Sequence, residues 1–210
     1  MHVAATSKVS KKPKKQIVTI SGTSRPNNYT SKVLALVNDE LDKRGVKVVH
    51  FDARELDLSF PGQPETDDAK RLTEAVKASG AVVLASPEYH GTFTAMTKLI
   101  VENLGFPSAL KGKPVALLGV ASGRIGAIKT LEQMRGMCGH VGALVLPSPI
   151  SVAGVRNVFN EDGTCNDETV EQMVRGLAET TLQFMHEYVY PRYELEQMVR
   201  GDEKGWSTTV

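Results

Sequence analysis

The chain has 210 residues, of which 41% are hydrophobic and 23% are charged, a length and composition typical of one domain with a substantial core. The 25 Lys and Arg residues nearly balance the 24 Asp and Glu residues, so the net charge of +1 provides no field that would hold nucleic acid. Cys138 and Cys165 are far apart in the sequence, which indicates neither a disulfide framework nor a cysteine-based metal site, and we predict no metal.

The two ends of the chain differ from its middle. Residues 1–15 carry five lysines and few apolar residues, which predicts a disordered basic tail. No apolar run approaches the ~20 residues that span a bilayer, and the N-terminus lacks the apolar core of a secretory signal. We therefore expect a cytoplasmic protein that binds neither membrane nor nucleic acid. Residues 16–190 should form the domain. Pro191 should end the last helix and begin a C-terminal tail, 191–210, which is either floppy or an arm on a partner subunit.

Short apolar segments alternate with helical patterns between these ends. In chain order we expect a strand at 17–20, a helix from 30 to 44, a strand at 46–51, a helix at 69–78, a strand at 81–85, a helix at 94–104, a strand at 114–120, a helix at 126–138, a strand at 143–146 and a helix at 169–188. Segment 81–85 (AVVLA) is uninterrupted apolar, as in a strand covered on both faces.

Five strands alternating with helices predict an α/β fold with one doubly wound parallel sheet. The leading expectation is the flavodoxin-like strand order 2-1-3-4-5. Such sheets bind ligands beyond the carboxyl ends of the strands, where the strand order reverses. Function should therefore lie in the loops after the first, third and fourth strands.

The first loop (residues 21–31, SGTSRPNNYTS) carries hydroxyl groups, two amides and Arg25 at the start of a helix. A helix N-terminus presents unpaired N–H groups that bind phosphate readily. The loop matches neither the dinucleotide fingerprint nor the Walker motif. An ordinary capped turn remains the alternative, because Ser, Thr and Asn are good N-caps.

The second loop (residues 86–93, SPEYHGTF) places Tyr89 between Pro87 and Gly91, where its ring could meet a planar ligand. The alternatives are that Tyr89 only packs the loop and that His90 faces solvent. The third loop (residues 121–126, ASGRIG) has glycines that allow close backbone approach, and Arg124 is either a ligand contact or a solvated side chain.

Over residues 16–188 the sequence resembles the NADPH-dependent FMN reductases, which include quinone, chromate and azo-dye reductases. The resemblance rests on Gly22-Thr23-Ser24-Arg25 with Asn28 and Thr30, on Ser86-Pro87-Glu88-Tyr89-His90-Gly91 with Lys98 downstream, on Ser122-Gly123-Arg124-Ile125-Gly126, and on Phe159-Asn160-Glu161-Asp162-Gly163. The second of these motifs is the most specific. The departures are His90 for Asn, Asn28 for Ser, and Thr94-Ala95-Met96 for a Pro-Gly pair.

The resemblance implies a noncovalent FMN with NADPH or NADH as electron donor. Its phosphate would be surrounded by Thr23, Arg25, Asn28, Tyr29 and Thr30. Its isoalloxazine ring would be lined by Pro87, Glu88, Tyr89, His90 and Gly91, mostly through backbone groups, and closed on the other side by Ser122, Gly123 and Arg124.

This implies an NAD(P)H-dependent reductase of quinones, flavins or other small acceptors that works by ping-pong hydride transfer through flavin N5, without a catalytic side chain. Arg124 and Arg156 are candidates for the nucleotide phosphates, and a homodimer or homotetramer is implied. Two other classes stay open: a flavodoxin-like electron carrier, disfavoured by the net charge of +1, and a scaffold protein that has lost the cofactor.

Overall fold

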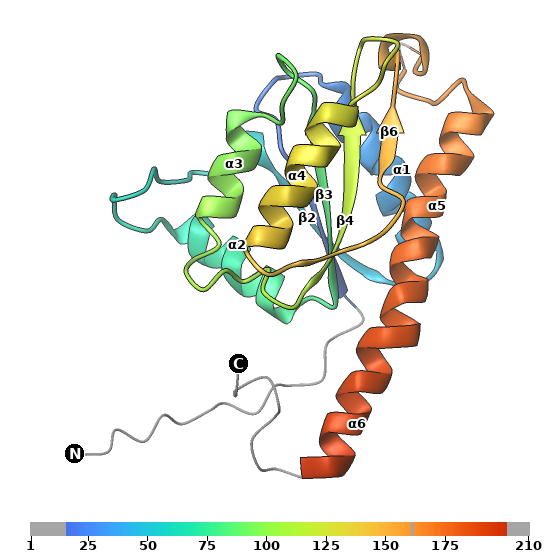
Figure 1. The fold of residues 1–210 in the computed structure, drawn as a ribbon. Coiled ribbons are helices and arrows are strands. Elements are labelled where there is room, and N and C mark those ends of the chain that lie inside the picture. The colour runs from blue at the N-terminus through green and yellow to red at the C-terminus, as the bar shows by residue number, and fades with distance from the viewer. Residues whose placement is uncertain (1–15, 161, 201–210) are drawn as a thin grey trace.

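The computed structural model describes residues 16–160 and 162–200, so the expected basic tail (1–15) and the last ten residues (201–210) lie outside the described residues. A central parallel sheet runs through the molecule (Figure 1). Its strands are β1 (Gln16–Ser21), β2 (Lys47–Asp52), β3 (Ala81–Pro87), β4 (Pro114–Val120), β5 (Leu144–Val145) and β6 (Ile150–Val152). The order β2-β1-β3-β4-β5 confirms the predicted flavodoxin-like topology.

Helices cover both faces of this sheet (Figure 1). One face packs against α1 (Tyr29–Lys43) and α5 (Glu168–Phe184). The other packs against α2 (Asp67–Ala78), α3 (Ala95–Glu102) and α4 (Ile128–His140). Every residue of β1, β3 and β4 is buried, which is why β3 and β4 contain continuous apolar runs rather than an alternating pattern. Two 3-10 turns, η1 (Ala53–Glu55) and η2 (Val155–Asn157), complete the described domain.

The fifth position of the sheet is divided, which corrects the expectation of five strands. β5 pairs with the start of β4, and β6 pairs with its end. Between them stand Pro147, Ser148 and Pro149, and Ser148 has a φ of +57°. A proline has no N–H group to donate to a neighbouring strand, so the edge strand breaks at this segment and pairing resumes directly after Pro149.

The expectation that Pro191 ends the last helix is wrong. A π-helical segment, η3 (Met185–Val189), joins α5 to α6 (Tyr190–Arg200), and the three form one long helical rod (Figure 1). The N–H of Tyr190 bonds to the carbonyl of Met185, five residues back. This wider turn directly before Pro191 replaces the i→i−4 hydrogen bonds of an α-helix, which are the pattern that a proline interrupts. No helix within the described ranges is long and apolar enough to cross a membrane.

Lys113 lies just before β4 and yields a pH-dependent test of the packing. Its ammonium group donates to the carbonyls of Ser79, at 2.5 Å, and Lys77, at 3.3 Å, where α2 ends. Burial lowers the pKa of Lys113 from 10.5 to about 8. Between these two values the unfolded chain binds the proton that the folded chain has released, so Lys113 makes stability rise with pH from about 8 to 10.5.

We expect the difference in unfolding free energy between the native protein and Lys113→Met to shift in favour of the native protein as pH rises through this range. Chemical denaturation at a series of pH values measures it. Lys111→Met, a change at an exposed lysine, is the control and should show no such trend. A difference for Lys113→Met that stays constant with pH would contradict the prediction.

Candidate functional site

The three predicted loops lie together at the carboxyl edge of the sheet, because they follow the adjacent strands β1, β3 and β4 (Figure 1). Backbone hydrogen bonds join them. The N–H of Gly22 donates to the carbonyl of Ala85 at 2.8 Å, and the N–H of Glu88 donates to the carbonyl of Val120 at 2.8 Å. The first loop is thus fixed to the strand that leads into the second, and the second to the strand that leads into the third.

A buried hydroxyl network ties the first and second loops more tightly. The carbonyl of Gly22 accepts hydrogen bonds from the hydroxyls of Thr94 and Thr97, the latter at 3.0 Å. The Thr97 hydroxyl also lies 3.0 Å from the Ser86 hydroxyl, which accepts from the N–H of Thr94. Thr94 in addition caps α3 through the N–H of Thr97. Sequence reasoning missed this role, although two hydroxyls spaced i, i+3 at a helix start were its visible signal.

The first loop buries one predicted residue and exposes another. Thr23 is 1% exposed, and its hydroxyl lies 3.4 Å from the hydroxyl of Tyr89 in the second loop. Arg25 is exposed, and no carboxylate among the described residues lies within salt-bridge distance of it. The loop therefore offers an unneutralised guanidinium beside the start of α1.

Asn28 is the N-cap of α1, as the alternative of a capped turn supposed. Its Oδ1 accepts from the N–H of Ser31 at 2.7 Å, and its Nδ2 donates to the carbonyl of Arg25 at 2.9 Å. The side chain thus shapes the loop, while the N–H groups of Tyr29 and Thr30, ahead of Ser31 in the first turn, have no acceptor within the helix. Such groups are the ones that bind phosphate at helix N-termini.

Tyr29 and Thr30 direct their side chains to the protein. The ring of Tyr29 packs 6.3 Å from that of Phe159, with the ammonium group of Lys32 at 5.3 Å from its centroid. Thr30 is buried. These two predicted residues can therefore meet a ligand chiefly through backbone groups.

A buried carboxylate near the first loop is neutralised. Asp52 ends β2 and lies 3.5 Å from the Ser31 hydroxyl. Burial acts to raise the pKa of Asp52, but hydrogen bonds from Arg54, at 2.6–3.0 Å, outweigh it and lower that pKa. The ion pair leaves little uncompensated negative charge to oppose an anion at the start of α1.

The second loop contains a tight reversal at Tyr89–Thr92. Tyr89 and Thr92 exchange backbone hydrogen bonds of 2.9 and 3.1 Å, and the two residues between them have φ values of +52° (His90) and +76° (Gly91). Positive φ at both central positions is the type I′ pattern, which favours Asn-Gly. His tolerates this conformation better than most residues, which explains how His90 occupies a position where the similar family has Asn. Its side chain is exposed, as is a third of Tyr89.

Helix α4 holds this reversal from one side. Ala127 provides no side-chain cap for α4, and the Glu88 carboxylate instead accepts from the N–H of Thr130 at 3.1 Å. Gln133 donates to the carbonyl of Gly91 at 3.0 Å and accepts from the hydroxyl of Thr92 at 2.6 Å. The side chain of Glu88 therefore supports the loop, which leaves backbone groups and the Tyr89 ring to face a ligand.

The third loop is fixed to the segment after β6. The carbonyl of Gly123 accepts from the N–H groups of Gly154, at 3.0 Å, and Gly126, at 3.3 Å. Ser122, Gly123 and Arg124 are exposed. Because Gly154 immediately precedes η2, the loop that carries Arg124 lies beside the turn that carries Arg156.

Comparisons with known proteins agree with this geometry. The family model described as NADPH-dependent FMN reductase matches residues 16–157. An NADPH azoreductase from Bacillus sp. (strain OY1-2) is 29% identical over 164 residues, which cover 77% of this chain and 90% of that protein. An FMN-dependent NADPH-azoreductase from Staphylococcus aureus is 25% identical over 181 residues, covering 81% and 95%. The flavoenzyme NAD(P)H:(acceptor) oxidoreductase of Paracoccus denitrificans shares the fold, with a TM-score of 0.68, 20% identity and coverage of 82% and 98%.

Gly22 gives a direct test of the contact between the first and second loops. A Cβ at this position would lie 2.1 Å from the Thr97 hydroxyl and 2.8 Å from the Ala85 carbonyl. We expect Gly22→Ala to lower the unfolding free energy by about 1–3 kcal/mol, as overpacking does. Gly136→Ala is the control, since Gly136 lies within α4 with no atom near the added methyl, and it should stabilise by about 0.5–1 kcal/mol. Urea unfolding measures both, and equal stabilities for the two variants would refute the crowding at Gly22.

Proposed function

The chain belongs to the NADPH-dependent FMN reductase family, and from this premise we propose that it reduces quinones, free flavins or similar small acceptors by a ping-pong cycle. Its general role is that of an oxidoreductase with FMN as cofactor and NADPH as electron donor. The choice among acceptors, the use of NADH and a homodimeric or homotetrameric assembly are part of the proposal. The convergence of three loops at one sheet edge is the observation that supports it most.

The first loop is proposed to hold the FMN phosphate. Arg25 supplies a positive charge that pairs with no carboxylate in residues 16–160 and 162–200, and the N–H groups of Tyr29 and Thr30 supply donors at the start of α1. The Thr23 hydroxyl, at 3.4 Å from Tyr89, stands between the phosphate end and the second loop. Asn28 contributes by holding the loop in this shape.

The second and third loops are proposed to hold the ring. Backbone groups of Pro87, Glu88, His90 and Gly91 and the ring of Tyr89 would face one side. Ser122, Gly123 and Arg124 would close the other side, as the family resemblance implies. The type I′ turn and its support from α4 keep these backbone groups in place before a ligand arrives, which reduces the entropic cost of binding.

FMN, when bound, would supply the hydride-transfer and two-electron redox chemistry, so the protein need not supply a general base. The chain's own residues bind and orient. Arg124 and Arg156, brought together by the hydrogen bond between Gly123 and Gly154, are proposed to contact the diphosphate of the pyridine nucleotide. We propose that donor and acceptor occupy the same place in turn, as a ping-pong cycle requires.

Anaerobic stopped-flow spectroscopy of the purified, FMN-loaded protein tests the proposed function. We expect NADPH to bleach the visible absorbance that makes the oxidised flavin yellow. A quinone or free flavin added afterwards should restore that absorbance. Reoxidation across a panel of quinones, flavins, azo dyes and metal oxyanions ranks the acceptors. A yellow protein that neither NADPH nor NADH bleaches would instead support an electron carrier, and a protein that stays colourless with added FMN would support a scaffold.

Arg25 provides a test of where the phosphate binds. Because a charge-assisted hydrogen bond contributes about 1.5–3 kcal/mol, Arg25→Ala should weaken FMN binding by roughly tenfold to hundredfold and leave riboflavin binding little changed. Fluorescence titration of the apoprotein measures both ligands. Arg135→Ala, at an exposed position on α4 away from the first loop, is the matched control. Equal losses for FMN and riboflavin would place the phosphate elsewhere.

A further inference from the structure

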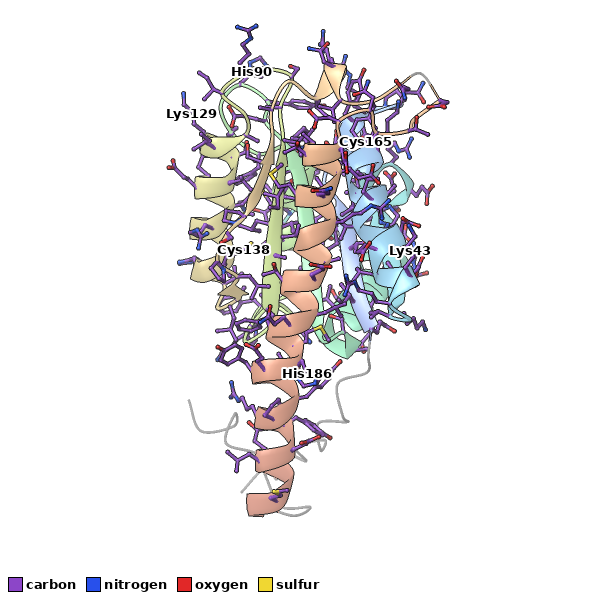
Figure 2. All side chains as sticks on the ribbon, turned by 90° about the vertical axis from the view of Figure 1, so that its right-hand side faces the viewer. Lys43, His90, Lys129, Cys138, Cys165 and His186 are labelled. Carbon is purple, nitrogen blue, oxygen red and sulfur yellow. The ribbon has the colours of Figure 1, made fainter. Side chains whose placement is uncertain are left out.

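Lys129 lies against the tight turn of the second loop. It is the second residue of α4, and a Cβ built on Gly91 would be 3.6 Å from Lys129 Cδ and 4.0 Å from its Nζ. Figure 2 shows Lys129 and His90 at the same end of the molecule, the end opposite His186. The ammonium group therefore stands at the rim of the carboxyl edge, beside the backbone that is proposed to face the flavin ring.

Among the residues that the structure describes, none neutralises the charge of Lys129. Within residues 16–160 and 162–200, no carboxylate lies within 4.0 Å of its ammonium group. Four other lysines, Lys43, Lys70, Lys77 and Lys98, each pair with a carboxylate at three or four residues' spacing. The nearby Glu88 carboxylate is engaged with the N–H of Thr130. An exposed cation kept without a partner at a ligand-binding rim is suited to bind an anion.

The surroundings of Lys129 fix the position of its backbone beside the second loop. Gln133, one turn further along α4, bonds to both Gly91 and Thr92, and Glu88 bonds to Thr130. The turn and the first two turns of α4 are thus one unit. The backbone of Lys129 therefore stays beside the second loop, while its side chain is free to change rotamer.

We propose that Lys129 binds the 2′-phosphate of NADPH and so makes the protein prefer NADPH to NADH. This inference rests on the proposed function. The two nucleotides differ only in that phosphate monoester, which carries close to two negative charges at neutral pH. Of the unpaired cations at this edge, Arg25 is assigned to the FMN phosphate, and Arg124 and Arg156 to the diphosphate shared by both nucleotides. Lys129, which lies against the second loop, is a cation that none of these assignments uses.

The test compares Lys129→Ala and Lys129→Arg with the native, FMN-loaded protein. Isothermal titration with 2′,5′-ADP and with 5′-AMP isolates the 2′-phosphate without any turnover. We expect Lys129→Ala to weaken 2′,5′-ADP by about tenfold to hundredfold, to leave 5′-AMP unchanged and to lower the ratio of kcat/KM for NADPH over NADH by a similar factor. Lys129→Arg should retain most of both, and Lys111→Ala, which removes an exposed lysine at the opposite edge, should alter neither.

Three results would overturn the assignment. One is an unchanged affinity for 2′,5′-ADP in Lys129→Ala, another an equal loss for 5′-AMP, and the third a loss of FMN itself, which would make Lys129 a flavin residue. In a protein that NADPH still bleaches, each of these leaves the proposed function intact. A protein that NADPH does not bleach overturns the proposed function and this inference with it.

Discussion

The carbonyl oxygen of Gly22 is the point on which the geometry of the site depends. It is buried between the two threonine hydroxyls of Thr94 and Thr97, and the N–H of the same residue bonds to Ala85. Burying a carbonyl without a hydrogen-bond donor costs about 1–3 kcal/mol of folding free energy. The hydrogen bonds to the Gly22 carbonyl therefore form together with the contact between the two loops. Their joint formation fixes the first loop against the second, and only glycine leaves room for the contact.

The positions of β3 and β4 could be predicted from the sequence because burial on both faces gives them uninterrupted apolar runs. The strand order could be expected from the alternation of strands with helices. The predicted meeting of the three loops followed from topology, since parallel strands bring their carboxyl ends to one edge. The segments 86–91 and 121–126 could be recognised as motifs because they interrupt the apolar runs of the strands that they follow.

The long-range partners of individual side chains could not be predicted. Whether Asn28 caps a helix or binds a ligand, and whether Glu88 reaches a ligand or the N–H of Thr130, depends on contacts between residues far apart in sequence. The same holds for the hydroxyls of Thr94 and Thr97. The prediction that Pro191 ends the last helix was wrong because it assumed the hydrogen-bond pattern of an α-helix. The π-helical turn before Pro191 has a different hydrogen-bond pattern. Single-sequence patterns carry no signal for that turn.

The two outer borders of the sheet bear on how the molecule behaves in a crowded solution. Within the part of the chain that the structure describes, β2 pairs only with β1, and β5 and β6 pair only with β4. β2 exposes Lys47 and His50 along its length, and the other border is broken by Pro147 and Pro149. Charged or interrupted edge strands give a neighbouring chain no continuous template to extend. The break between β5 and β6 thus works as a guard against strand-by-strand aggregation.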